Sequence, residues 1–126
     1  MATAPAGWYP KRGEVYIVQL DKPRPAIVLS IDPINKFALD VCVVGITTVE
    51  RRTFSMRIPI KKGDAHLDFN CWAKCDQVTT LEKCLLKYPP IGVLSAERFA
   101  RIEEQVKICL GLPSAQPSTA LRETLS

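Results

Sequence analysis

The sequence predicts a β-rich α+β fold, in which a small bent antiparallel sheet or open barrel is followed by one C-terminal helix. Short apolar segments with many β-branched residues fill most of the chain, and many are separated by only three to five residues. Such short connections are typical of antiparallel hairpins. With 126 residues, 47% of them apolar, the chain is long enough for one domain with a modest core.

Six segments have the composition of strands. Residues 14–20 alternate apolar and polar side chains in part, and residues 54–60 alternate strictly. Residues 25–31 form a nearly continuous apolar run, as expected of a strand that is buried on both faces. The predicted strands are therefore 14–20, 25–31, 39–46, 54–60, 70–74 and 77–80.

A single helix is predicted at Ala96–Leu110, where the apolar period changes to that of a helix. Ser95 suits the N-cap, and Gly111 followed by Pro113 is a stop signal. The helix should pack its apolar face on the sheet. That face carries Phe99, Ile102, Val106 and Cys109.

Both ends of the chain differ in composition from its middle. Residues 1–10 are rich in Ala, Pro and Gly, and residues 113–126 in Pro, Ser, Thr and Ala, so both are expected to be disordered. The predicted domain is then 11–112. No apolar run approaches the roughly 20 residues of a membrane span, and the start has no secretory signal pattern. We therefore expect a cytoplasmic protein that does not bind membranes.

The cysteines fit no disulfide framework, because their number is odd and their spacing irregular. Three residues separate Cys71 from Cys75, a spacing compatible with zinc, but there is no second close pair and His66 is the only histidine. Buried, reduced thiols are the favoured interpretation, with neither metal nor cofactor. The cysteines are Cys42, Cys71, Cys75, Cys84 and Cys109.

Positive charge is concentrated in the first half of the chain. Residues 1–62 contain ten Lys and Arg against five Asp and Glu, whereas residues 63–126 contain seven against eight. A basic half favours a surface for a polyanion. A solvated, lysine-rich surface explains the same charge equally well.

Five segments, in this order and spacing, resemble the toxins of the MazF/PemK family, also called Kid. The Arg-Pro-apolar segment is the most diagnostic of them. The resemblance covers residues 11–112 and implies the β-rich fold shared by MazF, PemK and CcdB proteins. The segments are 11–16 (KRGEVY), 24–30 (RPAIVLS), 46–48 (ITT), 75–78 (CDQV) and 91–95 (IGVLS).

The resemblance implies the toxin of a type II toxin–antitoxin system, an endoribonuclease that cleaves single-stranded RNA or mRNA at selected sequences and so stops translation and growth. Arg24 falls on the family's catalytic arginine and Thr47 on its catalytic threonine. A guanidinium suits the spread negative charge of a phosphorane, and a threonine hydroxyl can orient a phosphate oxygen. Without the resemblance, both would be interpreted as ordinary surface residues.

The residues also limit the mechanism by which this chain would cut RNA. One histidine rules out a two-histidine mechanism, and the scattered acidic residues disfavour a metal mechanism. We expect attack by the neighbouring 2′-hydroxyl, which leaves a 2′,3′-cyclic phosphate. Lys22, Arg51 and Arg52 are candidates for phosphate contacts and Gln77 for a base edge, although each also fits an ordinary surface or sheet role.

One segment departs from the family pattern. The family usually has a longer loop between the first two strands, and here only residues 21–23 separate Leu20 from Arg24. The shortening leaves the catalytic candidates in place, and we expect it to change how RNA is clamped, which sequence is cut and how efficiently.

The resemblance also implies partners, namely a second copy in a homodimer and a cognate antitoxin whose acidic segment covers the site. Two alternatives remain. One is a CcdB-type gyrase poison, and the other is a non-catalytic protein that binds RNA or antitoxin, which the short loop suggests.

Overall fold

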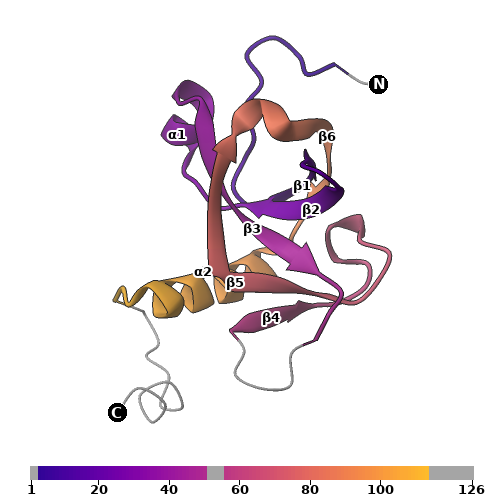
Figure 1. Cartoon of the computed structure of the whole chain (residues 1–126), viewed down its shortest axis with the longest axis vertical. Helices are drawn as coiled ribbons and strands as arrows, with labels where there is room; N and C mark the ends of the chain where they lie inside the picture. The colour runs from indigo at the N-terminus through magenta and orange to yellow at the C-terminus, as the bar shows by residue number, and fades with distance from the viewer. Residues whose placement is uncertain (1–2, 51–55, 114–126) are drawn as a thin grey trace.

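The computed structural model describes residues 3–50 and 56–113. Six antiparallel strands form one bent sheet in the order β4-β5-β3-β2-β1-β6, and helix α2 lies across one of its faces (Figure 1). This architecture confirms the predicted fold class. The elements are β1 (Glu14–Gln19), β2 (Pro23–Val28), α1 (Asp32–Phe37), β3 (Asp40–Thr47), β4 (Arg57–Ile60), η1 (Asp64–His66), β5 (Cys71–Glu82), η2 (Lys83–Leu85), β6 (Leu86–Val93) and α2 (Ala96–Leu110).

Strand β5 replaces the two short strands predicted at 70–74 and 77–80. Its register against β3 shifts in the middle, because Val44 pairs with Val78 whereas Ile46 pairs with Ala73. Residues 74–77 of β5 therefore lie opposite a single residue of β3, Gly45. Such a bulge bends a strand and increases its twist, and Figure 1 shows β5 turning sharply along its length.

Helix α1 is absent from the sequence prediction because buried polar contacts hold it in place. Asn35 is fully buried, and its side-chain amide donates to the carbonyl oxygen of Ser30 at 2.7 Å. The backbone of Asn35 is held as well, because the ammonium of Lys83 donates to its carbonyl oxygen at 2.9 Å. Ile34 and Phe37 of the same helix are exposed, so it has no apolar periodicity to detect.

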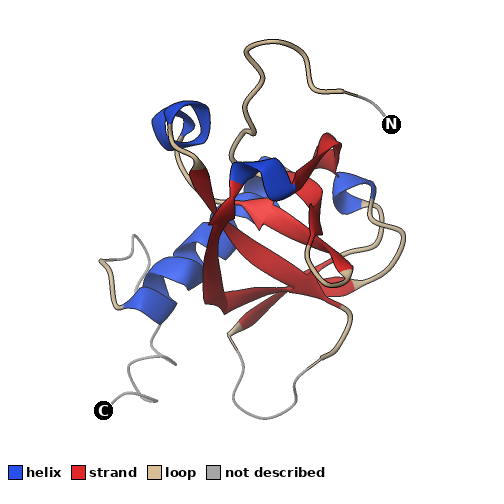
Figure 2. Cartoon of the chain, turned by 45° about the horizontal axis from the view of Figure 1, so that its top comes forward, coloured by secondary structure: helices blue, strands red, loops and turns tan. Residues whose placement is uncertain are grey.

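The buried side chains form two clusters on opposite faces of the sheet. Alternate residues of a strand point to opposite faces, so Ala26 belongs to one cluster and Ile27 to the other. Helix α2 covers the first face and contacts β4 and β5 (Figure 2). It follows the predicted N-cap, where the Ser95 hydroxyl accepts from the Arg98 amide at 3.3 Å, and it ends at Leu110 with Gly111 as the C-cap.

The segment before β1 is partly packed. The Trp8 ring makes edge-to-face contacts with Tyr16 and Tyr88, at centroid distances of 5.9 and 5.7 Å. The predicted disorder of residues 1–10 therefore does not extend to Trp8, which packs against the second cluster. The predicted tail lies outside the described residues from residue 114 onward. Among the described residues, no helix is long and apolar enough to cross a membrane.

Candidate active site

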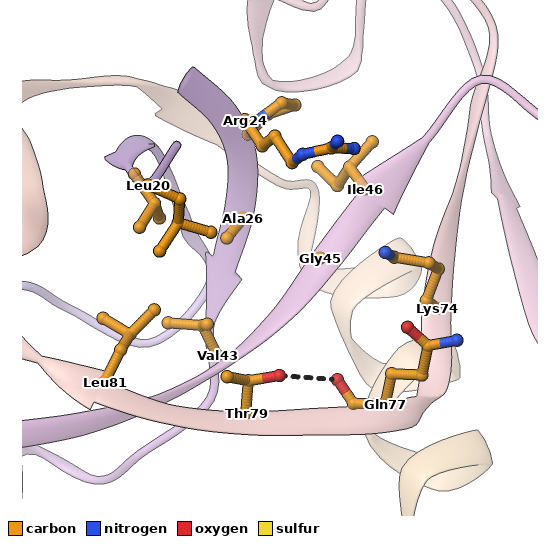
Figure 3. Close-up of a pocket in the computed structure, with 12 residues that line it drawn as sticks. Leu20, Arg24, Ala26, Val43, Gly45, Ile46, Lys74, Gln77, Thr79 and Leu81 are labelled. Atoms are coloured by element: carbon orange, nitrogen blue, oxygen red, sulfur yellow. Dashed lines mark hydrogen bonds between the residues drawn. The ribbon is translucent and has the colours of Figure 1, made fainter. Parts of the chain in front are cut away.

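A pocket of about 100 Å³ opens on the face of the sheet opposite α2 (Figure 3). Apolar side chains from β1, β2, β3 and β5 form its walls, and four polar side chains stand around them. The apolar residues include Val18, Leu20, Ala26, Val43, Ile46 and Leu81, and the polar ones are Arg24, Lys74, Gln77 and Thr79.

The order of the strands explains why the pocket lies here. Strand β3 runs between β2 and β5, and Ala26 of β2 pairs with Gly45 of β3. Because both residues are small, the surface over β3, between β2 and β5, is hollow. Arg24 reaches this hollow from β2 and Lys74 from β5, so their charges approach it from opposite sides (Figure 3).

The side chain of Lys74 lies directly over Gly45. A Cβ atom added at Gly45 would come 3.0 Å from Cε and 3.4 Å from Nζ of Lys74. The absence of a side chain at Gly45 thus gives the lysine its path toward the pocket. Sequence reasoning missed Lys74, because the bulge that directs it toward β3 is a property of strand pairing.

The two predicted catalytic residues lie close to each other in the sheet, but only one of them lines the pocket. Arg24 is exposed and lines the pocket. Thr47 does not line it, but it follows the lining residue Ile46 and lies on the same face of β3 as Gly45. Two residues along a strand span roughly 7 Å, which places Thr47 beside the pocket.

Of the predicted RNA-binding residues that the structure describes, only Gln77 is found in the pocket lining. Gln77 lines the pocket, and its carbonyl oxygen accepts from the Thr79 hydroxyl at 3.4 Å (Figure 3). Lys22 is exposed in the short connection between β1 and β2 and is not part of the lining. Arg51 and Arg52 lie outside the described residues. The structure therefore brings Arg24 and Gln77 together and adds Lys74 and Thr79.

The five cysteines are free. Cys71 and Cys75 are buried as predicted, and burial raises the pKa of Cys75 to about 12, so this thiol stays protonated and unreactive at neutral pH. The prediction is wrong for Cys84, which is exposed. Within residues 3–50 and 56–113, no three His, Cys, Asp or Glu side chains are grouped so that they could hold a metal ion.

The comparison with known families agrees with this geometry. Residues 11–110 match the family described as the PemK-like, MazF-like toxin of type II toxin–antitoxin systems. The chain belongs to this family. The resemblance drawn from five short segments is thereby confirmed, and the match spans nearly all of the predicted domain.

Curated relatives in the PemK/MazF family carry named activities. Endoribonuclease MazF9 of Mycobacterium tuberculosis is 28% identical over 116 residues, an alignment that covers 81% of this chain and 97% of the relative. Endoribonuclease MazF of Staphylococcus saprophyticus is 27% identical over 111 residues, with coverage of 81% and 92%.

Solved structures agree with the fold. A mycobacterial endoribonuclease in complex with its cognate antitoxin superposes with a TM-score of 0.72 at 28% identity, covering 86% of this chain and 99% of that one. A MazE–MazF complex from Deinococcus radiodurans gives a TM-score of 0.71 at 18% identity, covering 84% and 99%. At that identity the second likeness concerns the fold alone.

Proposed function

We propose that this chain, an endoribonuclease toxin of a type II toxin–antitoxin system, cleaves single-stranded RNA, including mRNA, at the Arg24 pocket without a metal ion. The observation that carries the proposal is the approach of two cationic side chains, Arg24 and Lys74, to the hollow above Gly45 from opposite sides. A phosphodiester in this hollow would be neutralised by both charges, with the Thr47 hydroxyl beside it.

In the proposed reaction the 2′-oxygen of the RNA attacks the adjacent phosphorus in line. The 2′-hydroxyl releases its proton to water as the bond from the 2′-oxygen to phosphorus forms. The bond to the 5′-oxygen breaks and that oxygen takes up a proton, which leaves a 2′,3′-cyclic phosphate and a 5′-hydroxyl. The guanidinium of Arg24 stabilises the charge that grows on the phosphorane oxygens, because it stays protonated and offers a planar set of donors. Thr47 donates one hydrogen bond that orients the phosphate.

The remaining lining residues suit a nucleobase. Apolar walls accept a flat ring, while the side chains of Gln77 and Thr79 carry hydrogen-bonding groups that can read its edge. Sequence-selective cleavage in this proposal therefore depends on the β5 side of the pocket.

The proposal includes two partners. A homodimer would bind RNA near its subunit interface, and an acidic segment of a cognate antitoxin would cover the cationic pocket. The net charge of +4 and the placement of Arg24 and Lys74 suit both polyanions. A cytoplasmic location, where mRNA is translated, completes the proposal.

The test is cleavage of a long unstructured RNA in EDTA by the wild type and by Arg24→Ala, with the ends mapped by primer extension. We expect discrete cuts with 2′,3′-cyclic phosphate ends, and a rate at least about 100-fold lower in the variant. Arg101→Ala is the matched control, because this exposed arginine lies on α2, away from the pocket. RNA that stays intact at high enzyme concentration would overturn the catalytic proposal.

The short connection between β1 and β2 favours a second candidate, a protein that binds RNA or antitoxin without cutting. Only residues 20–22 join the two strands. Retention of RNA in a gel-shift assay without cleavage products would select it. Inhibition of gyrase in a supercoiling assay would instead select the CcdB-type activity.

A further inference from the structure

The turn that follows β3 is held by its polar groups. The hydroxyl oxygen of Thr47 accepts a hydrogen bond from the backbone amide of Val49 at 3.1 Å. The Val49 side chain is 62% exposed, and Thr48 is exposed as well. Apolar packing therefore contributes little to the conformation of this turn, and hydrogen bonds set it.

Arg57 makes the second contact to the same residue. Its guanidinium donates from Nη1 to the carbonyl oxygen of Val49. Arg57 is the first residue of β4 and pairs with Lys74 of β5, so its backbone is fixed in the same sheet as Thr47. Val49 is thus held on both sides, by Thr47 at its amide and by Arg57 at its carbonyl.

This arrangement determines what the Thr47 hydroxyl can offer a substrate. A threonine hydroxyl has one proton to donate and two lone pairs to accept with. Because one lone pair is engaged by the Val49 amide, the side chain is fixed and its proton remains available for a phosphate oxygen. If the turn opens, the hydroxyl is free to rotate and to donate elsewhere.

We propose that Arg57 is a positioning residue, which clamps the Thr47–Val49 turn so that the Thr47 hydroxyl presents its proton to the scissile phosphate. The inference rests on the proposed function, in which Thr47 orients that phosphate. Arg57 acts through Val49 and Thr47 and contributes no phosphate contact of its own.

The first test measures the clamp without any activity. Exchange of the Val49 amide proton with water, measured by NMR, should be about tenfold faster in Arg57→Met, because the hydrogen-bonded turn opens more often. Thr47→Val should have the same effect, since it removes the acceptor. Arg101→Met is the matched control and should leave the rate unchanged. A wild-type rate in Arg57→Met would overturn the proposal.

The second test is a double-mutant cycle on RNA cleavage. We expect Arg57→Met to lower kcat about tenfold with KM and its salt dependence unchanged, as for a misplaced orienting group. In the Thr47→Val background the same substitution should change kcat less than twofold, because its effect passes through Thr47. Independent, multiplicative effects would show that Arg57 does not act through Thr47 and would overturn the inference. A higher KM with a weaker salt dependence would also overturn it, by identifying Arg57 as a phosphate ligand.

The two proposals fail in different ways. A wild type that cuts no RNA removes the proposed function, and the exchange rate of Val49 then decides alone whether Arg57 holds the turn. A wild type that cuts normally, with independent effects of the two substitutions, removes only the role of Arg57.

Discussion

Gly45 has no side chain, and this leaves the space through which Lys74 reaches the pocket. In Gly45→Ala the new methyl group would lie 3.0 Å from Cε of Lys74, so the lysine must move. We expect RNA affinity to fall by about twofold in Kd, or about 0.4 kcal/mol, because the lysine chain shifts and its ammonium is displaced from the phosphate. The slope of log Kd against log salt should become shallower, by less than the roughly 0.7 that the loss of a whole phosphate contact gives. Fluorescence anisotropy with a 2′-O-methyl RNA, which lacks the attacking hydroxyl, measures both quantities.

Lys74→Met provides the control for Gly45. If Gly45 acts by giving the lysine its path, Gly45→Ala has no further effect on Kd in the Lys74→Met background. A full additional loss there would show that the methyl group obstructs RNA directly, and the account of Lys74 would be wrong.

The site residues could be predicted from the sequence only in part. Arg24 and Gln77 belong to recognisable segments, and both line the pocket. Lys74 follows the alternation of β5 but approaches Gly45 because of the bulge between β3 and β5. Nothing local in the sequence specifies that shift in register, so its contribution to the site becomes visible only when the strands are paired.

At the scale of elements, β6 and η1 make a close backbone contact at Gly92. A Cβ atom at Gly92 of β6 would lie 2.5 Å from the carbonyl oxygen of Ala65 in η1. Ala65 itself has a positive φ of 54°, a conformation that is costly for a residue with a side chain. The backbone of η1 is therefore pressed against β6, and Asp64 ties it further by accepting from the Ser95 amide at 3.0 Å.

Gly92→Ala should lower the free energy of unfolding by about 2 kcal/mol, because backbone rather than a flexible side chain must move. Urea denaturation followed by tryptophan fluorescence measures the change. Gly45→Ala is the matched control, since it adds the same methyl group to another strand but meets only a lysine chain. Equal destabilisation by the two substitutions would mean that the close approach of η1 does not matter.

An element could be predicted from the sequence when its own residues carry caps, stop residues or an apolar period. Helix α2 has an apolar stripe, an N-cap and a glycine stop, and its predicted bounds are those of the structure. Strand β6 contains Pro89 and Pro90, which argue against a strand in the sequence. The two prolines are tolerated because β6 lies at the edge of the sheet, where only β1 pairs with it among the described strands. That position is decided by the tertiary fold.

At the scale of the whole molecule, the core that α2 covers lies on one face of the sheet and the pocket opens on the other. The cluster beneath α2 contains Ile102, which is fully buried, together with residues of β1, β2, β3, β4 and β5. The opposite face contains the second cluster and the pocket, and Val43 belongs to both. Ile46 is shared by the two faces, because it belongs to the cluster beneath α2 and also lines the pocket. A substitution on α2 itself should therefore cost stability without removing an atom of the pocket walls.

Ile102→Ala tests this separation. Truncation of a fully buried isoleucine should lower the free energy of unfolding by about 3 kcal/mol. The folded fraction should still cleave RNA within about twofold of the wild-type kcat, since no atom of the pocket is removed. Val43→Ala is the control on the opposite face, because it destabilises the fold and also deletes part of the pocket wall. It should lower the cleavage rate at equal folded fraction, measured by urea titration beside initial rates. Equal losses of kcat in the two variants would show that the faces are coupled through the sheet, and that helix α2 helps to shape the pocket.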